Sequence, residues 1–264
     1  MIKYLLKLFH KFPDGMKLYL RSFKKQEQEF YELPWLVEKD TIAVDIGANK
    51  GAYTYALSRL VGKNGLVVSI EPIEELAAYI ARACRQLNLP VQVKQCCLSD
   101  RDGDGYLFIP LEVSELQAGL ATLNKKTSPQ GEQRQVKIRC LDEMLRGRNK
   151  RISFIKCDVE GHELKVFQGA INILKSDRPK IIVEIEQHHC DEPMESRFIF
   201  FKENGYEGFF LIHENGTKKL KSINPDWLIS PQGLESKLPK GVINFIFIPS
   251  ETITADYPPL KQAK

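Results

Sequence analysis

Apolar and polar positions alternate in blocks along most of the chain, from about residue 41 to residue 250. Short apolar runs, which are typical of buried strands, alternate with longer segments whose apolar residues recur every three or four positions, as they do on one face of a helix. The pattern predicts seven strands of one sheet, at 41–47, 66–72, 91–99, 152–159, 180–186, 208–214 and 242–249.

Helical patterns lie between most of these strands, at 52–62, 73–89, 162–176 and 194–205. This alternation indicates an α/β fold of the doubly wound, Rossmann-like kind, with a mostly parallel sheet and helices on both of its faces. No convincing helix joins the last two strands, so a direct return would make the final strand antiparallel.

A less regular segment interrupts the alternation. It is expected to hold a turn at 101–105, a strand at 106–110, a long polar loop over 111–135 and an edge strand at 135–141. Loops of that length inside a compact domain are often functional.

Charge is distributed unevenly along the chain of 264 residues, whose formal net charge is +4. Residues 1–30 hold seven basic and three acidic residues, so basic and acidic residues balance in the remainder. A neutral body argues against a nucleic-acid-binding surface over the main domain. We expect three regions, namely a basic amphipathic helical arm at 1–40, a main α/β domain at 41–250 and a tail at 251–264.

The arm carries apolar residues at helical spacing, with lysines offset from them. The apolar positions are Ile2, Leu5, Leu6, Phe9 and Phe12. Such a helix could contact an anionic membrane surface through residues 1–30, or it could pack on the domain as a lid. No uninterrupted apolar stretch is long enough for a signal peptide or a membrane span.

The six cysteines show no CxxC pair and no disulfide-framework spacing. Several fall inside apolar runs, as buried thiols often do. This usage indicates a reducing compartment, and the cytosol is expected.

The stretch AVDIGANKG follows the first predicted strand and punctuates a turn with Gly47, Asn49 and Gly51. Its spacing is neither the G-x-G-x-x-G dinucleotide pattern nor a P-loop, so pyrophosphate is not the expected ligand. The carboxylate of Asp45 suits a ligand with a cationic, amino-acid-like end, and glycines let the backbone approach it closely. Glu71 ends the second strand, where a carboxylate can accept hydrogen bonds from both hydroxyls of a ribose.

Five segments occur in an order that is characteristic of one enzyme family. They are 44–58, 70–72, 98–103, 140–144 and 156–170. With them the chain resembles the FkbM-type S-adenosylmethionine-dependent methyltransferases of the class I fold. The resemblance implies a seven-stranded sheet whose last strand is antiparallel. It also implies that S-adenosylmethionine is the cofactor.

The resemblance assigns the methionine end of the cofactor to Asp45, Gly47 and Gly51, and the ribose to Glu71. Ser99 and Asp100, after the third strand, are expected near the adenine. The full set expected around the cofactor is Asp45, Gly47, Ala48, Asn49, Gly51, Tyr53, Thr54, Glu71, Pro72, Ser99 and Asp100.

The stretch KCDVEGHE places acids and a histidine where the fourth core strand ends. Methyl transfer mainly requires alignment of donor and acceptor and removal of a proton. Asp158 is therefore the leading catalytic candidate, with Glu160 and His162 as base or substrate contacts, and histidine is the better base near neutral pH. Alternatively, either acid could simply cap the helix that follows.

The fifth core strand ends in EIEQHHCDE, which offers further polar side chains at the same edge of the sheet. Glu186 and His188 are expected to contact the substrate. Such a set could hold Mg²⁺ or a softer ion, but acid- and histidine-rich loop ends are more often solvated, so no metal is expected.

Together these features predict an O-methyltransferase that acts on a hydroxyl of a small molecule, a sugar or a glycoconjugate. A nicotinamide-dependent oxidoreductase on a similar sheet is one alternative. A non-catalytic module that keeps the fold while its arm binds a membrane or a partner is another. The acceptor and the oligomeric state stay open.

Overall fold

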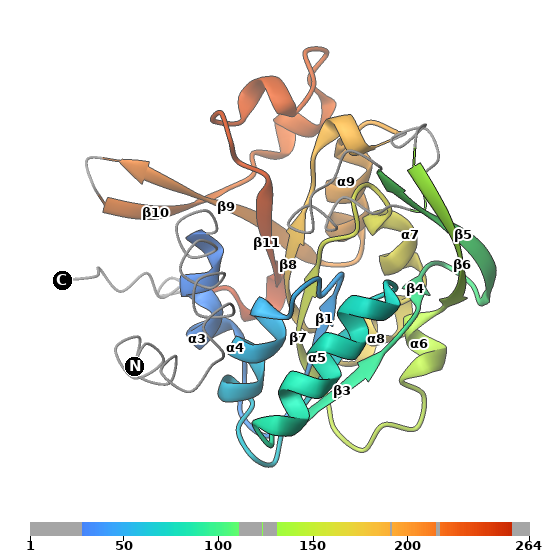
Figure 1. Cartoon of the computed structure of the whole chain (residues 1–264). Coiled ribbons are helices and arrows are strands. Elements are labelled where there is room, and N and C mark those ends of the chain that lie inside the picture. Colours follow the sequence, from blue (N-terminus) through green and yellow to red (C-terminus); the bar gives the residue numbers. More distant parts are fainter. Residues whose placement is uncertain (1–27, 111–122, 124–130, 191, 215–216, 255–264) are drawn as a thin grey trace.

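The computed structural model describes residues 28–110, 123, 131–190, 192–214 and 217–254. Its centre is an eight-stranded sheet in the order β10-β9-β11-β8-β7-β1-β2-β3 (Figure 1). The parallel strands at its core are β1 (Ile42–Ile46), β2 (Leu66–Ile70), β3 (Val91–Lys94), β7 (Ile152–Cys157) and β8 (Lys180–Glu184). The remaining strands are β9 (Tyr206–Glu214), β10 (Thr217–Ser222) and β11 (Asn244–Pro249).

The predicted α/β class is confirmed, and so is the antiparallel last strand, because β11 runs antiparallel to both β8 and β9. The predicted strand count was too low by one. β10 forms a hairpin with β9, in a segment for which no strand was predicted. Leu220 is the only aliphatic residue in its sequence TKKLKS, so the hydrophobic pattern gave no sign of a strand.

A second, three-stranded sheet lies beside the first, in the order β4-β6-β5. Its strands are β4 (Cys97–Leu98), β5 (Gly103–Pro110) and β6 (Gly131–Arg139). The predicted strand 91–99 is therefore wrong as one element, because the chain leaves the main sheet after Lys94 and pairs with β6 instead. The predicted turn at 101–105 is wrong from Gly103 onward, where β5 begins. Most of the predicted loop 111–135 lies outside the described residues, and its last five residues belong to β6.

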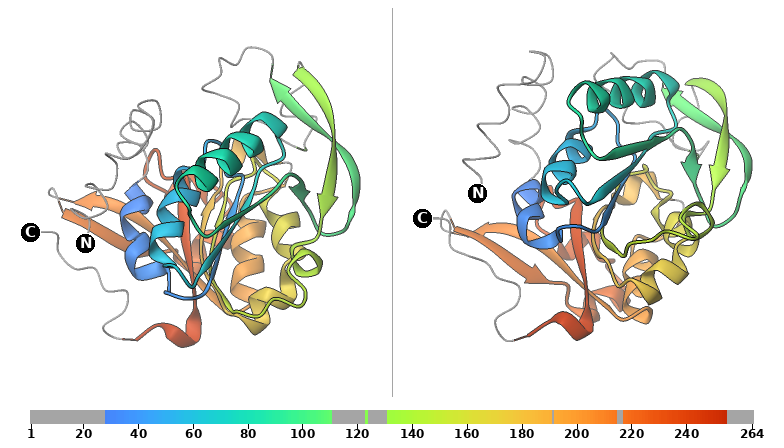
Figure 2. Two further views of the ribbon diagram at one scale, coloured as in Figure 1. Left: turned by 60° about the horizontal axis from the view of Figure 1, so that its bottom comes forward. Right: turned by 90° about the horizontal axis from the view of Figure 1, so that it is seen from below.

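Helices cover both faces of the main sheet, as predicted (Figure 2). One face carries α3 (Leu33–Leu36), α4 (Ala52–Leu60) and α5 (Glu74–Gln86). The other carries α7 (Glu163–Gln168), α8 (Ile171–Ser176) and α9 (Glu195–Glu203). Shorter elements are η2 (Gln28–Glu32), α6 (Leu141–Met144), η4 (Gln187–His189), η5 (Pro225–Ile229), η6 (Glu235–Lys237) and η7 (Ser250–Thr252).

Successive residues of a strand point to opposite faces, which explains why the central strands are apolar throughout. In β7, Phe154 packs into the core beneath α3 and α4, whereas Ile155 packs into the core beneath α7, α8 and α9. Both side chains are fully buried. The hydrophobic effect thus holds helices on the two faces at once.

The helix predicted over 162–176 is broken into α7 and α8 at Gly169. A Cβ atom at this position would lie 2.1 Å from the carbonyl oxygen of Ser99. The glycine therefore lets the end of α7 lie directly against the chain that follows β4. This contact places Ser99 at the edge of the site.

The N-terminal segment from residue 28 onward packs on the domain, where Phe30, Leu33 and Leu36 join the core beneath α4. The predicted membrane contact of residues 1–30 falls almost wholly outside the described residues. Among the residues that are described, no helix has both the length and the apolarity that a membrane span requires. At the other end, Glu251 forms an ion pair with Arg178.

Candidate functional site

The turn after β1 is wedged between the ends of two neighbouring strands. The backbone N–H groups of Gly47 and Ala48 donate to the carbonyl oxygen of Ile70 at 3.0 and 3.1 Å. On the other side, the N–H of Asp158 donates to the carbonyl oxygen of Ile46 at 3.0 Å. Gly47 has a φ of +75°, and a Cβ there would lie 1.8 Å from the carbonyl oxygen of Asp158. Only glycine satisfies both conditions.

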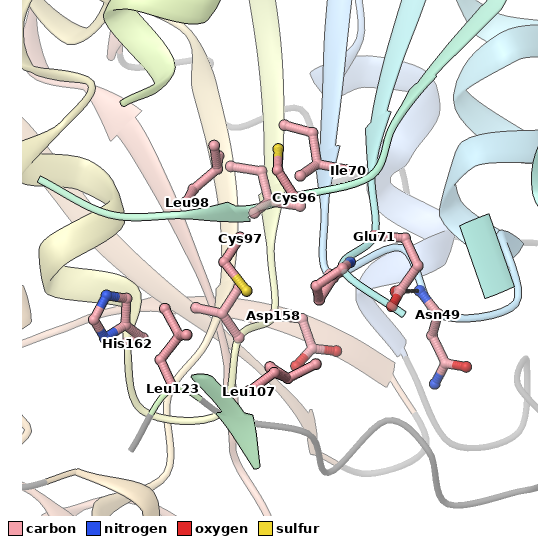
Figure 3. Close-up of a pocket in the computed structure, with 14 residues that line it drawn as sticks. Asn49, Ile70, Glu71, Cys96, Cys97, Leu98, Leu107, Leu123, Asp158 and His162 are labelled. Carbon is pink, nitrogen blue, oxygen red and sulfur yellow. Dashed lines mark hydrogen bonds between the residues drawn. The ribbon is translucent and has the colours of Figure 1, made fainter. Parts of the chain in front are cut away.

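A pocket opens beside this turn, at the carboxyl ends of β1, β2 and β7 (Figure 3). The small sheet and the segment before it supply much of its wall. The pocket is lined by Ile46, Gly47, Asn49, Ile70, Glu71, Pro72, Cys96, Cys97, Leu98, Leu107, Leu123, Asp158, Val159 and His162. A mainly apolar slot with a few polar groups at fixed points is the usual form of a site for a small molecule or a cofactor.

Glu71 is the polar anchor of this pocket. Its two carboxylate oxygens accept hydrogen bonds from the N–H groups of Asn49, at 2.7 Å, and Ile73, at 2.9 Å. Burial raises the pKa of this carboxyl to about 7, although both hydrogen bonds act in the opposite direction; the nearby Asp45 also raises it. Glu71 therefore ties the glycine turn to the end of β2, and each oxygen keeps lone pairs for a further donor.

The residues predicted around the cofactor divide into two groups. Gly47, Asn49, Glu71 and Pro72 line the pocket. The others are packed behind it or beside it, and these are Asp45, Ala48, Gly51, Tyr53, Thr54, Ser99 and Asp100.

The packed residues support the turn in different ways. The hydroxyl of Thr54 donates to Asp45 at 2.5 Å, beneath the turn. Ala48 belongs to a small cluster with Ile80 of α5. Gly51 has a φ of +79°, and a Cβ there would lie 3.2 Å from the same isoleucine. These residues therefore shape the turn without forming the pocket wall.

Ser99 and His162 meet at the end of the pocket formed by the small sheet. The Oγ atom of Ser99 lies 2.9 Å from Nε2 of His162 and donates to Asp100 at 3.1 Å. Because the single hydroxyl proton is used in this way, Nε2 of His162 is assigned as the donor to Ser99. Burial lowers the pKa of His162 to about 4. This imidazole is therefore neutral near pH 7.

Polar side chains also form a row across five adjacent strands, on the face that α4 covers. This polar row consists of Ser69 on β2, Asp45 on β1, Lys156 on β7, Glu184 on β8 and Asn244 on β11. Strand register pairs Asp45 with both Ser69 and Lys156, and Glu184 with Asn244. The row follows from alternation, because each residue shares a face with the apolar residue two positions away.

Lys156 is the centre of the polar row, with a side chain only 2% exposed. Its Nζ atom donates to Oδ1 of Asn244 at 3.1 Å and lies 3.9 Å from Glu184. It also lies 4.0 Å from Asp158 and 5.2 Å from the centre of the Tyr53 ring. A buried ammonium is tolerated only with such partners.

Asp158 joins the two parts of the site. It lines the pocket, and its carboxylate is also a partner of Lys156. Figure 3 shows it in the middle of the pocket, between His162 at one end and Glu71 and Asn49 at the other. A group held in the pocket would therefore meet a second molecule at Asp158.

Comparison with known proteins agrees with this geometry. Residues 45–207 match the family model described as the methyltransferase FkbM domain. The chain belongs to the FkbM methyltransferase family. No curated protein matches the sequence significantly.

One solved structure shares the fold of this FkbM chain at low sequence identity. The methyltransferase FkbM from Methylobacillus flagellatus KT has a TM-score of 0.51 and 15% identity. The match covers 87% of the present chain but 50% of that protein, so the present chain spans half of its length. A putative rRNA-methylase from Clostridium thermocellum has a TM-score of 0.48 and 12% identity, over 84% of this chain and 93% of that one.

A further cluster in this FkbM chain gathers around η4, where β8 ends. This histidine cluster consists of Glu160, Glu186, His188 and His189. The Nε2 atom of His189 lies 2.9 Å from Oε2 of Glu160 and 4.0 Å from Oε1 of Glu186. The hydrogen bond to Glu160 raises the pKa of His189. Glu186 and His188, both predicted from the sequence, therefore lie together, whereas Glu184 belongs to the polar row.

Several site residues of this FkbM chain were not predicted. The walls formed by Cys97, Leu98 and Leu107 belong to the small sheet, and although two of its strands were predicted, nothing in the sequence placed them against the pocket. Lys156 did leave a signal, because it is the only charged residue in the buried run ISFIKC. Charged residues are almost never fully buried without a partner.

Proposed function

We propose that this protein transfers a methyl group from S-adenosylmethionine to a hydroxyl of a small molecule, a sugar or a glycoconjugate. The observation that carries the cofactor assignment is the buried Glu71 beside a glycine turn and an apolar slot. A ribose needs a carboxylate that accepts from its two hydroxyls, and an adenine needs apolar walls. Both occur in one pocket, at the strand ends where this class of sheet binds ligands.

The pocket fits the cofactor part by part. Glu71 would accept hydrogen bonds from the ribose, and Cys97, Leu98 and Leu107 would contact the adenine. Gly47 and Asn49 would lie along the amino-acid end, with Asp45 behind the turn. When bound, S-adenosylmethionine would supply a methyl group on its sulfonium sulfur; the acceptor oxygen would bond to that methyl carbon as the carbon–sulfur bond breaks and S-adenosylhomocysteine leaves.

The remaining chemistry belongs to the chain's own side chains. A hydroxyl holds its proton tightly, so removal of that proton by a positioned base speeds the transfer. Asp158 would accept the proton; its place in the pocket lining, on the side of the polar row, supports this role. Lys156 would hold this carboxylate in position, and Glu184 and Asn244 would contact polar groups of the acceptor.

Calorimetric titration with S-adenosylhomocysteine tests the cofactor assignment. Wild type should bind one equivalent, and Glu71→Gln should bind at least tenfold more weakly, because a carboxamide cannot accept from both ribose hydroxyls. Glu75→Gln is the matched control, since Glu75 is an exposed acid of the neighbouring helix α5. Absence of binding by wild type, or equal binding by the Glu71 variant, would end this proposal.

The role of Asp158 is tested by Asp158→Asn. The change should lower methyl transfer about 100-fold, within the usual range for loss of a general base, while affinity for S-adenosylhomocysteine stays within about threefold. Transfer of radiolabelled methyl groups to a panel of glycosides and hydroxylated small molecules provides the measurement. Unchanged turnover on an accepted substrate would move the base to another residue.

A further inference from the structure

The histidine cluster has the spacing of a metal site. One ligand atom each of Glu186, His188 and His189 lies within 4.8 Å of the other two. Nδ1 of His188 is 3.5 Å from Oε2 of Glu186, and the carboxylate of Glu160 is 2.9 Å from His189. Ligands of a first-row metal ion at about 2.1 Å lie about 3–4 Å apart, so only small side-chain shifts would close the set.

The backbone holds these four side chains together from two separate strand ends. Glu160 has a φ of +52°, which is rare for a residue other than glycine. Next to it, a Cβ at Gly161 would lie 2.0 Å from the carbonyl oxygen of His189, so the two loops are in direct backbone contact. Such contact fixes the side chains of one loop relative to those of the other.

A buried ion pair fixes the first of these loops. Glu163 accepts a hydrogen bond from the N–H of Gly161 at 2.7 Å, and Arg197 of α9 donates to the carbonyl oxygen of Gly161 at 2.9 Å. The Arg197 and Glu163 side chains are 3.5 Å apart and almost fully buried. The cluster is therefore held by groups that do not belong to it.

We propose that Glu160, Glu186, His188 and His189 bind one divalent transition-metal ion. Two carboxylates and two neutral imidazoles give the set a charge of −2, which suits a dication. Imidazole nitrogen favours Zn²⁺, Fe²⁺ or Co²⁺ over Mg²⁺ and Ca²⁺, which prefer oxygen ligands. A metal was not expected from the sequence, because such loop ends are usually solvated; the geometry supplies the reason to propose one.

The site would be open on one side. The His188 side chain is 65% exposed, whereas those of Glu160 and His189 are 10% and 17% exposed. An ion held here would keep coordination positions for water or for an oxygen of an incoming molecule, as open metal sites do. It would lie at the loop that begins at Asp158, next to the proposed methyl-transfer position.

A simpler explanation is that the cluster is only an ion pair between His189 and Glu160. That explanation gives His188 no role, because this ring lies at the surface. His188→Ala therefore separates the two readings. An exposed ring can also be removed without opening the core, so this variant should fold.

Titration of the metal-free full chain with Co²⁺ tests the proposal. Visible absorption and calorimetry should show one equivalent bound, with the weak d–d bands of nitrogen and oxygen ligands. His188→Ala and Glu186→Gln should each weaken binding at least tenfold, and His189→Ala should abolish it. His213→Ala, which changes a histidine of the β9–β10 hairpin, should bind Co²⁺ as wild type does.

Three results would overturn the proposal. These are no Co²⁺ binding by wild type at millimolar concentration, equal binding by His188→Ala, or a thiolate-to-cobalt charge-transfer band that places the ion at a cysteine. Circular dichroism of each variant shows whether it is folded. The experiment needs neither cofactor nor acceptor, so its outcome is independent of the methyl-transfer proposal.

Discussion

The two sides of the site differ in the chemical groups that form them. On the side of β1 and β2, the pocket is shaped by backbone turns and apolar walls, with Glu71 as its buried acid. On the side of β7, β8 and β11, charged and amide side chains gather around the buried Lys156. A pocket shaped mainly by backbone suits a ligand that does not vary, such as a cofactor. A site made of side chains can be adapted to a different ligand by substituting one residue at a time. We infer that the first side holds the cofactor and the second selects the acceptor.

The two sides also differ in how far apart their residues lie along the sequence. Gly47 and Glu71 belong to turns that are close in sequence to the strands they follow. Lys156, Glu184 and Asn244 come from three strands that are separated by long segments, and they meet only because the sheet is complete. Substitutions should therefore have distinct signatures on the two sides.

Gly47→Ala should have the largest effect, because this residue lies where the two sides meet. The new Cβ would overlap the carbonyl oxygen of Asp158 at a positive φ. We expect a loss of about 3–5 kcal/mol in the free energy of unfolding. Gly62→Ala is the control, since Gly62 has a φ of +73° but no atom within 4 Å of its Cβ position, and about 1–2 kcal/mol should be lost there. Urea unfolding measures both; equal losses would mean that the sides are not in contact at Gly47.

Lys156→Met should have the next largest effect, which tests the acceptor side alone. The change leaves Glu184 and Asp158 without their buried cation, and a loss of about 2–4 kcal/mol in unfolding free energy is expected. Lys180→Met is matched in chemistry, but Lys180 lies at the opposite end of β8, where its ammonium donates to the carbonyl oxygen of Trp35 at 3.2 Å. Turnover should fall in the first variant and stay near wild type in the second. Similar turnover in both would remove Lys156 from the acceptor site.

Glu71 gives the cofactor side a pH dependence. Because burial raises its folded-state pKa from 4.5 to about 7, the folded protein keeps this proton when the unfolded chain has lost it. Stability should therefore fall as pH rises from 4.5 to 7, by on the order of 2–3 kcal/mol, and then level off. Urea unfolding of wild type and Glu71→Gln at several pH values isolates this contribution as their difference. A difference that does not change with pH would show that Glu71 ionises normally.

The fold was predictable because its signals are local. Apolar runs, helical periods and the glycine turn each occupy fewer than about twenty residues. Each signal therefore lies within a single strand, helix or turn. β10 escaped prediction because hairpin pairing with β9, rather than burial, makes it a strand. Two strands of the small sheet were also predicted, at 106–110 and 135–141, and they are confirmed as β5 and β6. β4 escaped because it contains only two residues, Cys97 and Leu98, and its partner strand begins beyond position 130.

Some of the residues that line the pocket were predictable, on the cofactor side and at Asp158 and His162, which follow the end of β7. Gly47, Asn49, Glu71 and Pro72 could be placed because they follow strand ends in a fixed order. Nothing in the spacing of Lys156 and Asn244 brings them within 3.1 Å, since their contact depends on an antiparallel return over a long segment. The neutral state of His162 likewise depends on burial, which residue type alone does not reveal.

Substitution of His162 should have the smallest effect. Its outcome decides whether His162 belongs to the cofactor side or to the acceptor side. The folded-state pKa of this histidine, about 4, lies below the ordinary 6.5. As pH falls below 6.5, the unfolded chain therefore binds a proton at this histidine while the folded protein does not, and the folded state loses stability. At pH 7.5, His162→Gln should cost about 1 kcal/mol, for the hydrogen bond to Ser99. At pH 5 this difference should reverse, with the variant the more stable by about 1 kcal/mol, because wild type has by then lost about 2 kcal/mol through the histidine. Urea unfolding at the two pH values measures this change, and the pH profile of methyl transfer between 6 and 8 should keep its shape in the variant. If the variant instead lost the change in methyl-transfer rate that wild type shows near neutral pH, His162 would be a base for the acceptor. The division between a neutral cofactor side and a charged acceptor side would then no longer hold.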